Sequence, residues 1–220
     1  MHPFRRILGL RSNLPSMLLT ALVAMVLLAG CAPFAGPPGP ITYIAGHGQP
    51  AIVCLGDSLT AGDAAPQSES YPAWLQRRLT AWGYNYRVVN AGSSGDRVAG
   101  GLARLRADVL SYRPAIAVVE LGSNDPGHTS VRSWESGLDT IITHLQAAGV
   151  RVILGGLDQP GMSAIYKEVA SSHRTPLVWF TDGLWGRPGL WGDAHHPSGA
   201  GYRVVMQNFW PAIFPYLHRG

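Results

Sequence analysis

The sequence predicts an α/β fold built on a mostly parallel sheet that helices cover on both faces. From residue 51 onward, short apolar segments followed by turn residues alternate with amphipathic segments long enough for helices. The segment 115–121 (AIAVVEL) is almost continuously apolar, as a central strand buried on both faces should be. This alternation of strands and helices is typical of a parallel sheet between two helical layers.

The elements are expected where these patterns begin and end. Apolar segments rich in β-branched residues predict strands at 51–55, 86–90, 115–121, 150–155 and 176–180. The amphipathic segments predict helices at 71–82, 98–112, 133–148, 162–172 and 198–213. Glu120 interrupts the third strand, where we favour a hydrogen-bonded structural carboxylate over one that faces a functional site.

Residues 1–30 have the pattern of a secretory signal rather than a membrane span. Three arginines precede an apolar stretch at 17–29 that is too short to cross a bilayer. The stretch ends in LAGC (28–31), which is similar to a bacterial lipobox, in which the cysteine is acylated and becomes the new N-terminus. We therefore expect Cys31 to carry a lipid anchor. A plain signal peptide with an incidental cysteine and a twin-arginine route are the alternatives.

Residues 31–49 are expected to be the lipidated cysteine and a tether, because the segment is rich in proline and glycine and almost uncharged. A flexible chain of this length reaches about 20–25 Å. Residues 50–220 then form one folded domain of ordinary size. Ala32 after the cysteine favours the outer membrane, and we expect an exported protein of the periplasm or cell surface.

The positive net charge belongs mostly to the signal segment. Removing residues 1–30 takes away three of the 17 Lys and Arg and none of the 13 Asp and Glu, so the net charge falls from +4 to +1. No dense run of Lys and Arg remains, and we expect no nucleic-acid partner. Cys54 is then the remaining thiol; its place in the first apolar run predicts a small buried side chain rather than a reactive one.

Ser58 is the candidate nucleophile, because it follows the first strand in the segment GDSL (56–59). In parallel sheets the residues just after strands line the ligand crevice. A serine hydroxyl is a weak nucleophile unless a base takes its proton and a third group orients that base. Later segments supply such groups, so the pattern indicates acyl-transfer chemistry.

His196 and Asp193 are the candidate base and orienting carboxylate. In the segment DAHHP (193–197) the spacing Asp-x-x-His lets the carboxylate on a tight turn reach one ring nitrogen while the other faces the serine. Pro197 then stiffens the entry to the last helix. His195 is the second choice for the base. A metal cluster of Asp193, His195 and His196 is disfavoured, because adjacent histidines diverge and no other His or Cys lies nearby.

Three donors are candidates for holding a developing oxyanion: the backbone N–H groups of Ser58 and Gly95 and the side-chain amide of Asn124. Each residue also has an ordinary interpretation, since Gly95 suits a turn and Asn124 a helix cap. Asp57 and Asp125 are expected to shape or cap the neighbouring segments.

Three tryptophans, Trp179, Trp185 and Trp191, precede the candidate histidine and suggest an aromatic wall for an acyl, aryl or sugar group. Ordinary core and loop packing is the favoured interpretation. His128 is expected to be an exposed loop histidine rather than a substrate contact.

Taken in order, these segments resemble the SGNH hydrolases, the superfamily of GDSL-type esterases and lipases. Ser58, Gly95, Asn124 and His196 match its four signature residues. The resemblance covers about residues 51–213. It is greatest to the bacterial thioesterase I, protease I and lysophospholipase-like arylesterase group, through segments 88–91, 94–96, 101–105 and 119–122.

The resemblance implies a flavodoxin-like three-layer α/β/α sandwich with five parallel strands in the order 2-1-3-4-5. It also implies a Ser-His-Asp serine hydrolase, without metal or other cofactor, that acts on carboxylic esters or thioesters through an acyl-enzyme. The chain departs from close relatives at Arg97, Ser123 and His195, where threonine, glycine and an apolar residue are usual. The loop 156–162 also looks shorter.

Short-to-medium acyl or aryl esters, with lysophospholipids as further candidates, are therefore the expected substrates, and we expect a monomer. An O-acetylesterase acting on peptidoglycan or polysaccharide is the enzymatic alternative. A non-catalytic envelope-binding lipoprotein is the alternative from another class. It is disfavoured because a binding module has no need to retain the Ser, Gly, Asn, Asp and His set.

Overall fold

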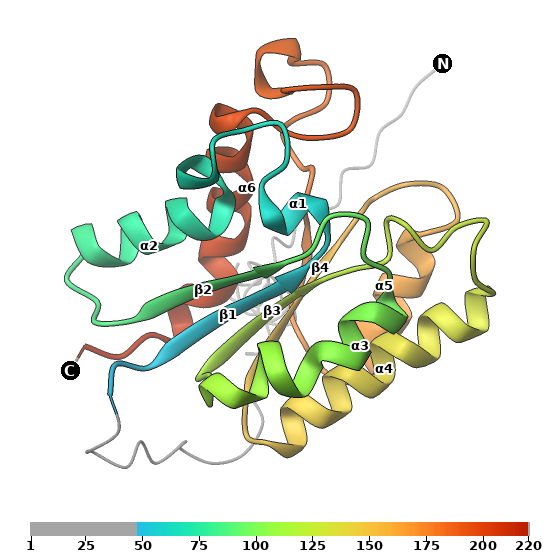
Figure 1. Ribbon diagram of the computed structural model, residues 1–220, viewed down its shortest axis with the longest axis horizontal. Coiled ribbons are helices and arrows are strands. Elements are labelled where there is room, and N and C mark those ends of the chain that lie inside the picture. The colour runs from blue at the N-terminus through green and yellow to red at the C-terminus, as the bar shows by residue number, and fades with distance from the viewer. Residues whose placement is uncertain (1–47, 220) are drawn as a thin grey trace, which may run out of the picture. The chain divides into compact units, whose positions relative to one another are not determined.

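The computed structural model describes residues 48–219, and its central feature is a five-stranded parallel sheet (Figure 1). The order β2-β1-β3-β4-β5 confirms the predicted topology. The expected signal segment, Cys31 and most of the tether lie outside the described residues. The strands are β1 (Ala51–Gly56), β2 (Arg87–Gly92), β3 (Ile116–Glu120), β4 (Arg151–Gly156) and β5 (Leu177–Trp179).

Helices cover both faces of this sheet and complete the three layers. The helix α3 packs against α4 and α4 against α5 on one face, while α2 packs against α6 on the other. A further short helix, α1, follows β1. The helices are α1 (Ser58–Ala61), α2 (Tyr71–Ala81), α3 (Val98–Asp108), α4 (Val131–Ala147), α5 (Ser163–Ser172) and α6 (Gly199–Ile213).

The predicted elements are confirmed with small shifts at their ends, and two differences have local causes. The helix expected at 98–112 ends at Asp108, because Val109 leaves the helical conformation and a separate 3₁₀ turn follows at Leu110–Tyr112. The helix α1 was not predicted, since four residues are too few for a periodic pattern.

The core lies on both faces of the central strands. Every residue of β1 and β3 is buried, whereas the edge strand β2 is partly exposed. Between the sheet and helices α2 and α6, the rings of Tyr71 and Phe209 stack with centroids 5.3 Å apart, and Phe180 meets Tyr71 edge-on at 5.6 Å. No helix within residues 48–219 has the length and apolarity needed to span a bilayer.

Cys54 lies in the middle of β1 as the predicted small buried side chain. It is fully buried, and burial raises the pKa of its thiol to about 12. The thiol therefore stays protonated and unreactive at neutral pH.

Glu120 is the one ionisable residue of β3, and it is buried at the strand's carboxyl end. Its exposed fraction is 1%, and its Oε2 accepts a hydrogen bond of 2.9 Å from the hydroxyl of Thr60. Burial, followed by the nearby carboxylate of Asp57, raises the pKa of Glu120 well above its usual range. The side chain is thus the hydrogen-bonded structural carboxyl that the sequence favoured.

The raised pKa of Glu120 makes the free energy of unfolding depend on pH. Above about pH 4.3 the unfolded chain loses this proton while the folded chain keeps it, so stability falls as pH rises toward the folded-state pKa. Glu120→Gln keeps an acceptor for Thr60 and should remove this loss, which is at most about 1.4 kcal/mol for each pH unit. Urea denaturation between pH 5 and 8 measures it.

The matched control is Glu168→Gln, because Glu168 is exposed on α5. We expect the free energy of unfolding of Glu120→Gln to increase relative to that of the wild type as pH rises. The free energy of unfolding of Glu168→Gln should keep a constant difference from that of the wild type. Parallel pH profiles for the wild type and Glu120→Gln would contradict this account of the carboxyl.

Candidate functional site

Ser58 lies at the C-terminal edge of the sheet, the edge at which all five strands end. It is the first residue of α1 and is half-buried. Asp57 caps this helix, because its Oδ1 accepts a hydrogen bond of 3.0 Å from the backbone N–H of Leu59. The cap holds the turn that presents the Ser58 hydroxyl above the strand ends.

Two glycines allow α1 to lie directly against the strand ends. Gly56 and Gly92 end β1 and β2 and are register partners. A Cβ on Gly56 would overlap the Thr60 side chain, and one on Gly92 would overlap the backbone of Ala61. Any larger residue at either position would therefore push α1, and Ser58 with it, away from the sheet.

A tight turn before α6 presents Asp193 and His196. The Asp193 Oδ1 accepts hydrogen bonds from the backbone N–H groups of His195 and His196, at 2.8 and 2.7 Å. An antiparallel bridge between Trp191 and Pro197 closes the turn. The backbone of this turn thus sets the positions of the Asp193 carboxylate and the His196 ring.

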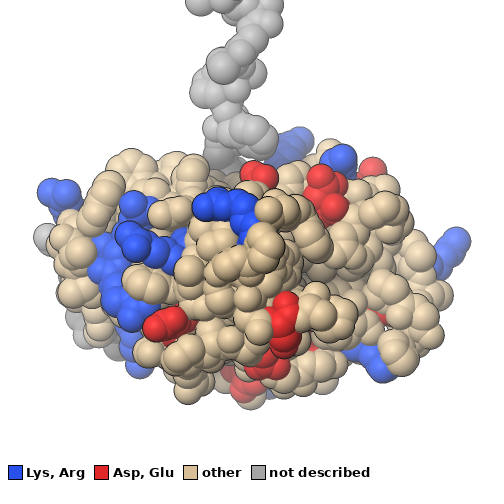
Figure 2. Space-filling model, turned by 90° about the horizontal axis from the view of Figure 1, so that it is seen from above, with Lys and Arg blue, Asp and Glu red and all other residues tan. Residues whose placement is uncertain are grey.

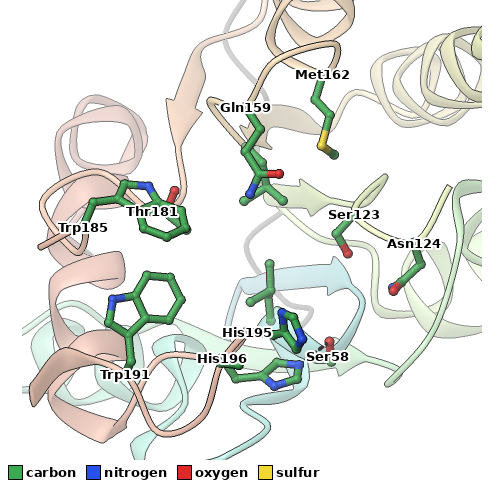
Figure 3. A pocket seen from close by; sticks show the side chains of 13 residues that line it. Ser58, Ser123, Asn124, Gln159, Met162, Thr181, Trp185, Trp191, His195 and His196 are labelled. Carbon is green, nitrogen blue, oxygen red and sulfur yellow. Dashed lines mark hydrogen bonds between the residues drawn. The ribbon is translucent and has the colours of Figure 1, made fainter. Parts of the chain in front are cut away.

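The structure brings Ser58, His196 and Asp193 into one hydrogen-bonded chain. The Ser58 Oγ lies 3.0 Å from His196 Nε2 (Figure 3). Asp193 Oδ1 and Oδ2 lie 3.0 and 2.9 Å from His196 Nδ1. Hydrogen bonds from the His195 N–H, the His196 side chain and the His196 N–H lower the pKa of Asp193 to about 2. The ionised carboxylate of Asp193 accepts the hydrogen bond from the Nδ1–H group of His196. The unprotonated Nε2 is then left to accept the proton of Ser58.

His195 and His196 both reach the same cavity, contrary to the expectation that adjacent histidines diverge. Their ring centroids are 6.4 Å apart and their planes nearly perpendicular, at 85°. Only His196 is hydrogen-bonded to Ser58 among the described contacts, while His195 lines the cavity wall. The perpendicular rings let two neighbours serve one cavity in different ways.

The cavity above Ser58 has a volume of about 320 Å³. In Figure 3 the indoles of Trp185 and Trp191 lie on one side of it, and Ser123 and Asn124 lie on the other side of Ser58. The two indole centroids are 4.9 Å apart with a tilt of 38°, and Trp185 is 60% exposed. Further walls come from the residues after β4 and β5, namely Leu157, Gln159, Met162 and Thr181.

Trp179 and His128 do not take part in this cavity. Trp179 ends β5 and lies beneath the Lys167 ammonium, 5.6 Å from its ring centroid. His128 is exposed on the loop after β3, as expected. Trp185 and Trp191 thus line the cavity, against the packing interpretation that the sequence analysis favoured, and Trp179 does not.

Asn124 joins the loop after β3 to the turn that contains Gly95. Its amide nitrogen donates to the Asp96 carbonyl oxygen at 2.9 Å and to Asp57 Oδ2 at 3.3 Å. Gly95 has a φ of +78°, a conformation that favours glycine, within the turn closed by the Asp96 N–H to Ser93 carbonyl bond of 3.0 Å. The bond from Asn124 to Asp96 brings the turn of Gly95 next to Asn124. Gly95 itself does not line the cavity of Ser58.

Asp57 does more than shape its turn, and the sequence did not reveal this. It is fully buried, and besides Leu59 it accepts hydrogen bonds at Oδ2 from the Ser123 hydroxyl and the Asn124 amide. Burial raises the pKa of Asp57, while the bond from Ser123 acts in the opposite direction. Ser123, one of the departures from the family pattern, therefore supplies a donor beneath the site that glycine would lack.

Arg104 on α3 holds the strand ends and the Gly95 turn together. Its guanidinium donates to the carbonyl oxygens of Gly56 and Ala91 at 2.9 and 2.8 Å, and to the Asp96 carboxylate at 2.8 Å. The sequence showed this arginine only as part of the segment 101–105, because its partners lie on three other segments. It connects β1, β2 and the turn through one rigid planar group.

Asp125 stabilises the start of α3 rather than the segment that follows it. Its Oδ2 accepts a hydrogen bond of 3.1 Å from the backbone N–H of Val98. Arg97, another departure from the family pattern, is exposed at the N-cap of the same helix. Within the part of the chain that the structure describes, no three His, Cys, Asp or Glu side chains are grouped to hold a metal ion.

Comparison with known proteins adds a family to this geometry. Residues 54–204 match the model of the GDSL-like Lipase/Acylhydrolase family. The chain is 36% identical over 178 residues to Esterase TesA of Pseudomonas aeruginosa, a match that covers 76% of this chain and 89% of the relative. It is 32% identical over 159 residues to Thioesterase 1/protease 1/lysophospholipase L1 of Escherichia coli K12, covering 67% and 75%.

A solved structure agrees with the sequence relatives. The crystal structure of TesA superposes with a TM-score of 0.71 at 36% identity, covering 76% of this chain and 99% of that one. The part of the chain that matches the family model, residues 54–204, includes every strand of the sheet except the first residues of β1.

Proposed function

The chain belongs to the GDSL-like lipase/acylhydrolase family, and we propose that it is a serine esterase that hydrolyses carboxylic esters or thioesters through an acyl-enzyme. One observation carries the proposal. The Ser58 Oγ and His196 Nε2 are 3.0 Å apart, and Asp193 holds the other ring nitrogen. This is the arrangement that a serine nucleophile needs, with its base in hydrogen-bond reach and that base oriented by a third group.

In the first half of the reaction Ser58 becomes acylated. Its Oγ attacks the acyl carbon while its proton moves to His196 Nε2, and Asp193 stabilises the imidazolium that forms. His196 then gives this proton to the leaving oxygen or sulfur as the bond from the acyl carbon to that atom breaks. In the second half, water attacks the acyl-enzyme by the same route, so the acid and free Ser58 are released.

The oxyanion that forms at each attack needs donors fixed in advance. We assign this role to the backbone N–H groups of Ser58 and Gly95 and to the Asn124 amide. The bond from Asn124 to Asp57 is the longer of its two, at 3.3 Å against 2.9 Å to Asp96. It is the bond that Asn124 would exchange for the oxyanion, while the bond to Asp96 keeps the amide in place.

The adjacent histidines allow a matched test of the mechanism. His196→Ala should lower kcat for p-nitrophenyl acetate by about 10³-fold or more, because the serine loses its base. His195→Ala, which removes a neighbouring ring from the same cavity, should change kcat by less than about tenfold. Steady-state hydrolysis measures both, and labelling with a fluorophosphonate reports whether Ser58 is activated.

Ser58→Ala completes this set, since it should abolish both labelling and hydrolysis. Equal losses in the two histidine variants would contradict the assignment of the base to His196. Labelling that persists in Ser58→Ala would place the nucleophile elsewhere.

The substrates that suit the cavity are short-to-medium acyl or aryl esters, with lysophospholipids as further candidates. A second candidate function, an O-acetylesterase acting on peptidoglycan or polysaccharide, is favoured by the two indoles beside Ser58. Exposed aromatic rings bind the flat faces of aryl and sugar rings, and Trp185 is 60% exposed. Polar side chains of Gln159 and Thr181 share the cavity and suit hydroxyl groups.

Trp185→Ala tests whether this indole binds the ring of the substrate. Loss of one aromatic contact should raise KM for p-nitrophenyl acetate and for an O-acetylated pyranose by about three- to tenfold. Vinyl acetate, which has no ring, should be hydrolysed as by the wild type. The control is Trp82→Ala, because Trp82 is also an exposed tryptophan but lies at the C-cap of α2.

The wild-type profile over p-nitrophenyl esters from acetate to palmitate then separates the two functions. Activity confined to acetate, together with turnover of the acetylated sugar, favours the O-acetylesterase. An equal rise of KM for vinyl acetate in Trp185→Ala would show that the indole does not recognise the ring.

We also propose that the protein is exported and anchored in a membrane, the outer membrane by preference, through a lipid on Cys31. The support is the lipobox-like run at 28–31 after an apolar stretch of signal length. The full chain expressed in bacteria fed a labelled fatty acid should incorporate the label and fractionate with membranes. Cys31→Ala should lose the label, and a wild-type protein that stays unlabelled would contradict the anchor.

A further inference from the structure

A partly exposed group of aromatic and arginine side chains lies at the ends of α2 and α6. Trp82 and Phe214 are 47% and 45% exposed, although both are large and apolar. Their rings meet at 6.4 Å, and Trp210 lies 5.2 Å from Trp82 and 5.6 Å from Phe214. We call the following six residues the aromatic-arginine surface: Arg78, Trp82, Tyr84, Trp210, Phe214 and Arg219.

The arginines of this surface lie against the rings rather than against carboxylates. The Arg78 guanidinium carbon is 5.2 Å from the Trp82 ring centroid and 4.8 Å from that of Trp210. Arg219 lies 5.5 Å from the Tyr84 ring. Among residues 48–219, neither arginine is in an ion pair with a carboxylate. Their positive charges are therefore available to an anionic partner.

The surface belongs to the N-terminal edge of the sheet, where all strands begin. Both α2 and α6 run back from the C-terminal edge of the sheet and end at its N-terminal edge (Figure 1). Other arginines stand at or just before the strand starts, so the fold gathers charges that the sequence keeps apart. They are Arg87, Arg113, Arg151 and Arg174. At the left of Figure 2, the side of α2 in Figure 1, blue side chains gather.

The chain enters the folded domain beside this surface. The Arg87 backbone N–H donates to the Pro50 carbonyl oxygen at 2.9 Å, so the residues that follow the expected tether lie next to the start of β2. The His218 N–H donates to the Tyr86 hydroxyl at 3.2 Å, which brings the C-terminal segment to the same place. A lipid on Cys31 would therefore hold this edge of the domain nearest the bilayer.

The carboxylates concentrate at the opposite edge. The exposed carboxylates Asp158, Asp182 and Asp193 all follow strands or lie in the loops around Ser58. The net charge of the chain after residue 30 is only +1. Because arginines gather at one edge of the sheet and carboxylates at the other, the two edges differ in charge far more than this net charge indicates. An anionic surface would attract the N-terminal edge and repel the edge that holds the cavity.

We propose that the aromatic-arginine surface docks on anionic phospholipid headgroups of the membrane that anchors Cys31, a proposal that rests on the proposed location. Tryptophan and tyrosine suit the membrane interface, and arginine pairs with phosphate while its stem lies along apolar surface. A second copy of the chain is a poorer occupant, because a symmetric contact would set these arginines against one another. The cavity of Ser58 then faces away from the bilayer.

Binding to lipid vesicles tests this surface without the anchor. A protein of residues 32–220 serves, because residues 48–219 contain the complete sheet, its helices and one continuous core. We expect it to sediment with phosphatidylglycerol vesicles, far less with phosphatidylcholine vesicles, and less at 0.5 M than at 0.1 M salt. Arg219→Gln on this surface and Arg87→Gln at the same edge of the sheet should each lower the partition coefficient about fivefold. Trp82→Ala with Phe214→Ala should lower it further.

Matched controls come from the other edge of the sheet. Arg132→Gln and Trp185→Ala replace an exposed arginine and an exposed tryptophan there and should leave vesicle binding unchanged. Hydrolysis of p-nitrophenyl acetate by the docking variants should equal that of the wild type. An inactive wild type that still binds vesicles would count against the esterase and not against the docking surface.

Three results would overturn the proposal. One is no binding to phosphatidylglycerol vesicles, and another is an equal loss in the control variants. The third is a dimer in analytical ultracentrifugation that dissociates in Trp82→Ala with Phe214→Ala, since the occupant would then be a second copy.

Discussion

The site depends on the parallel direction of all five strands. Because every strand ends at the same edge, loops that are far apart in the chain meet there, and Ser58, Asn124 and His196 come from three of them. The helices only have to return the chain to the opposite edge. The chemistry is therefore carried by loops, while the buried strands fix where those loops begin.

Polar groups beneath the site turn this general arrangement into a defined one. Asp57 ties α1 to the loop of Ser123 and Asn124, and Arg104 ties the strand ends to the turn of Gly95. Charged hydrogen bonds of this kind are strong in a buried setting and have a fixed direction. They hold Asn124, the turn of Gly95 and Ser58 in one frame before a substrate arrives.

The sequence predicted most of the fold, because strand and helix periodicity is local information. The strand order came from the family resemblance, and the Asp193-His196 pair could be inferred from its spacing within one turn. The roles of Arg104 and Ser123 could not, because each depends on partners that only the fold brings near. The aromatic-arginine surface could not be predicted for the same reason, since its residues fall into two groups that are separated by more than a hundred positions.

Cys54, shielded in the middle of β1, bears on how this domain reaches its native state. It is the one cysteine within the described residues, so no disulfide can form inside this domain, and its protonated thiol does not take part in thiol exchange. Maturation of the domain needs no oxidoreductase or isomerase to select a bridge. Its folding speed is instead governed by the closure of long parallel crossovers between non-neighbouring segments.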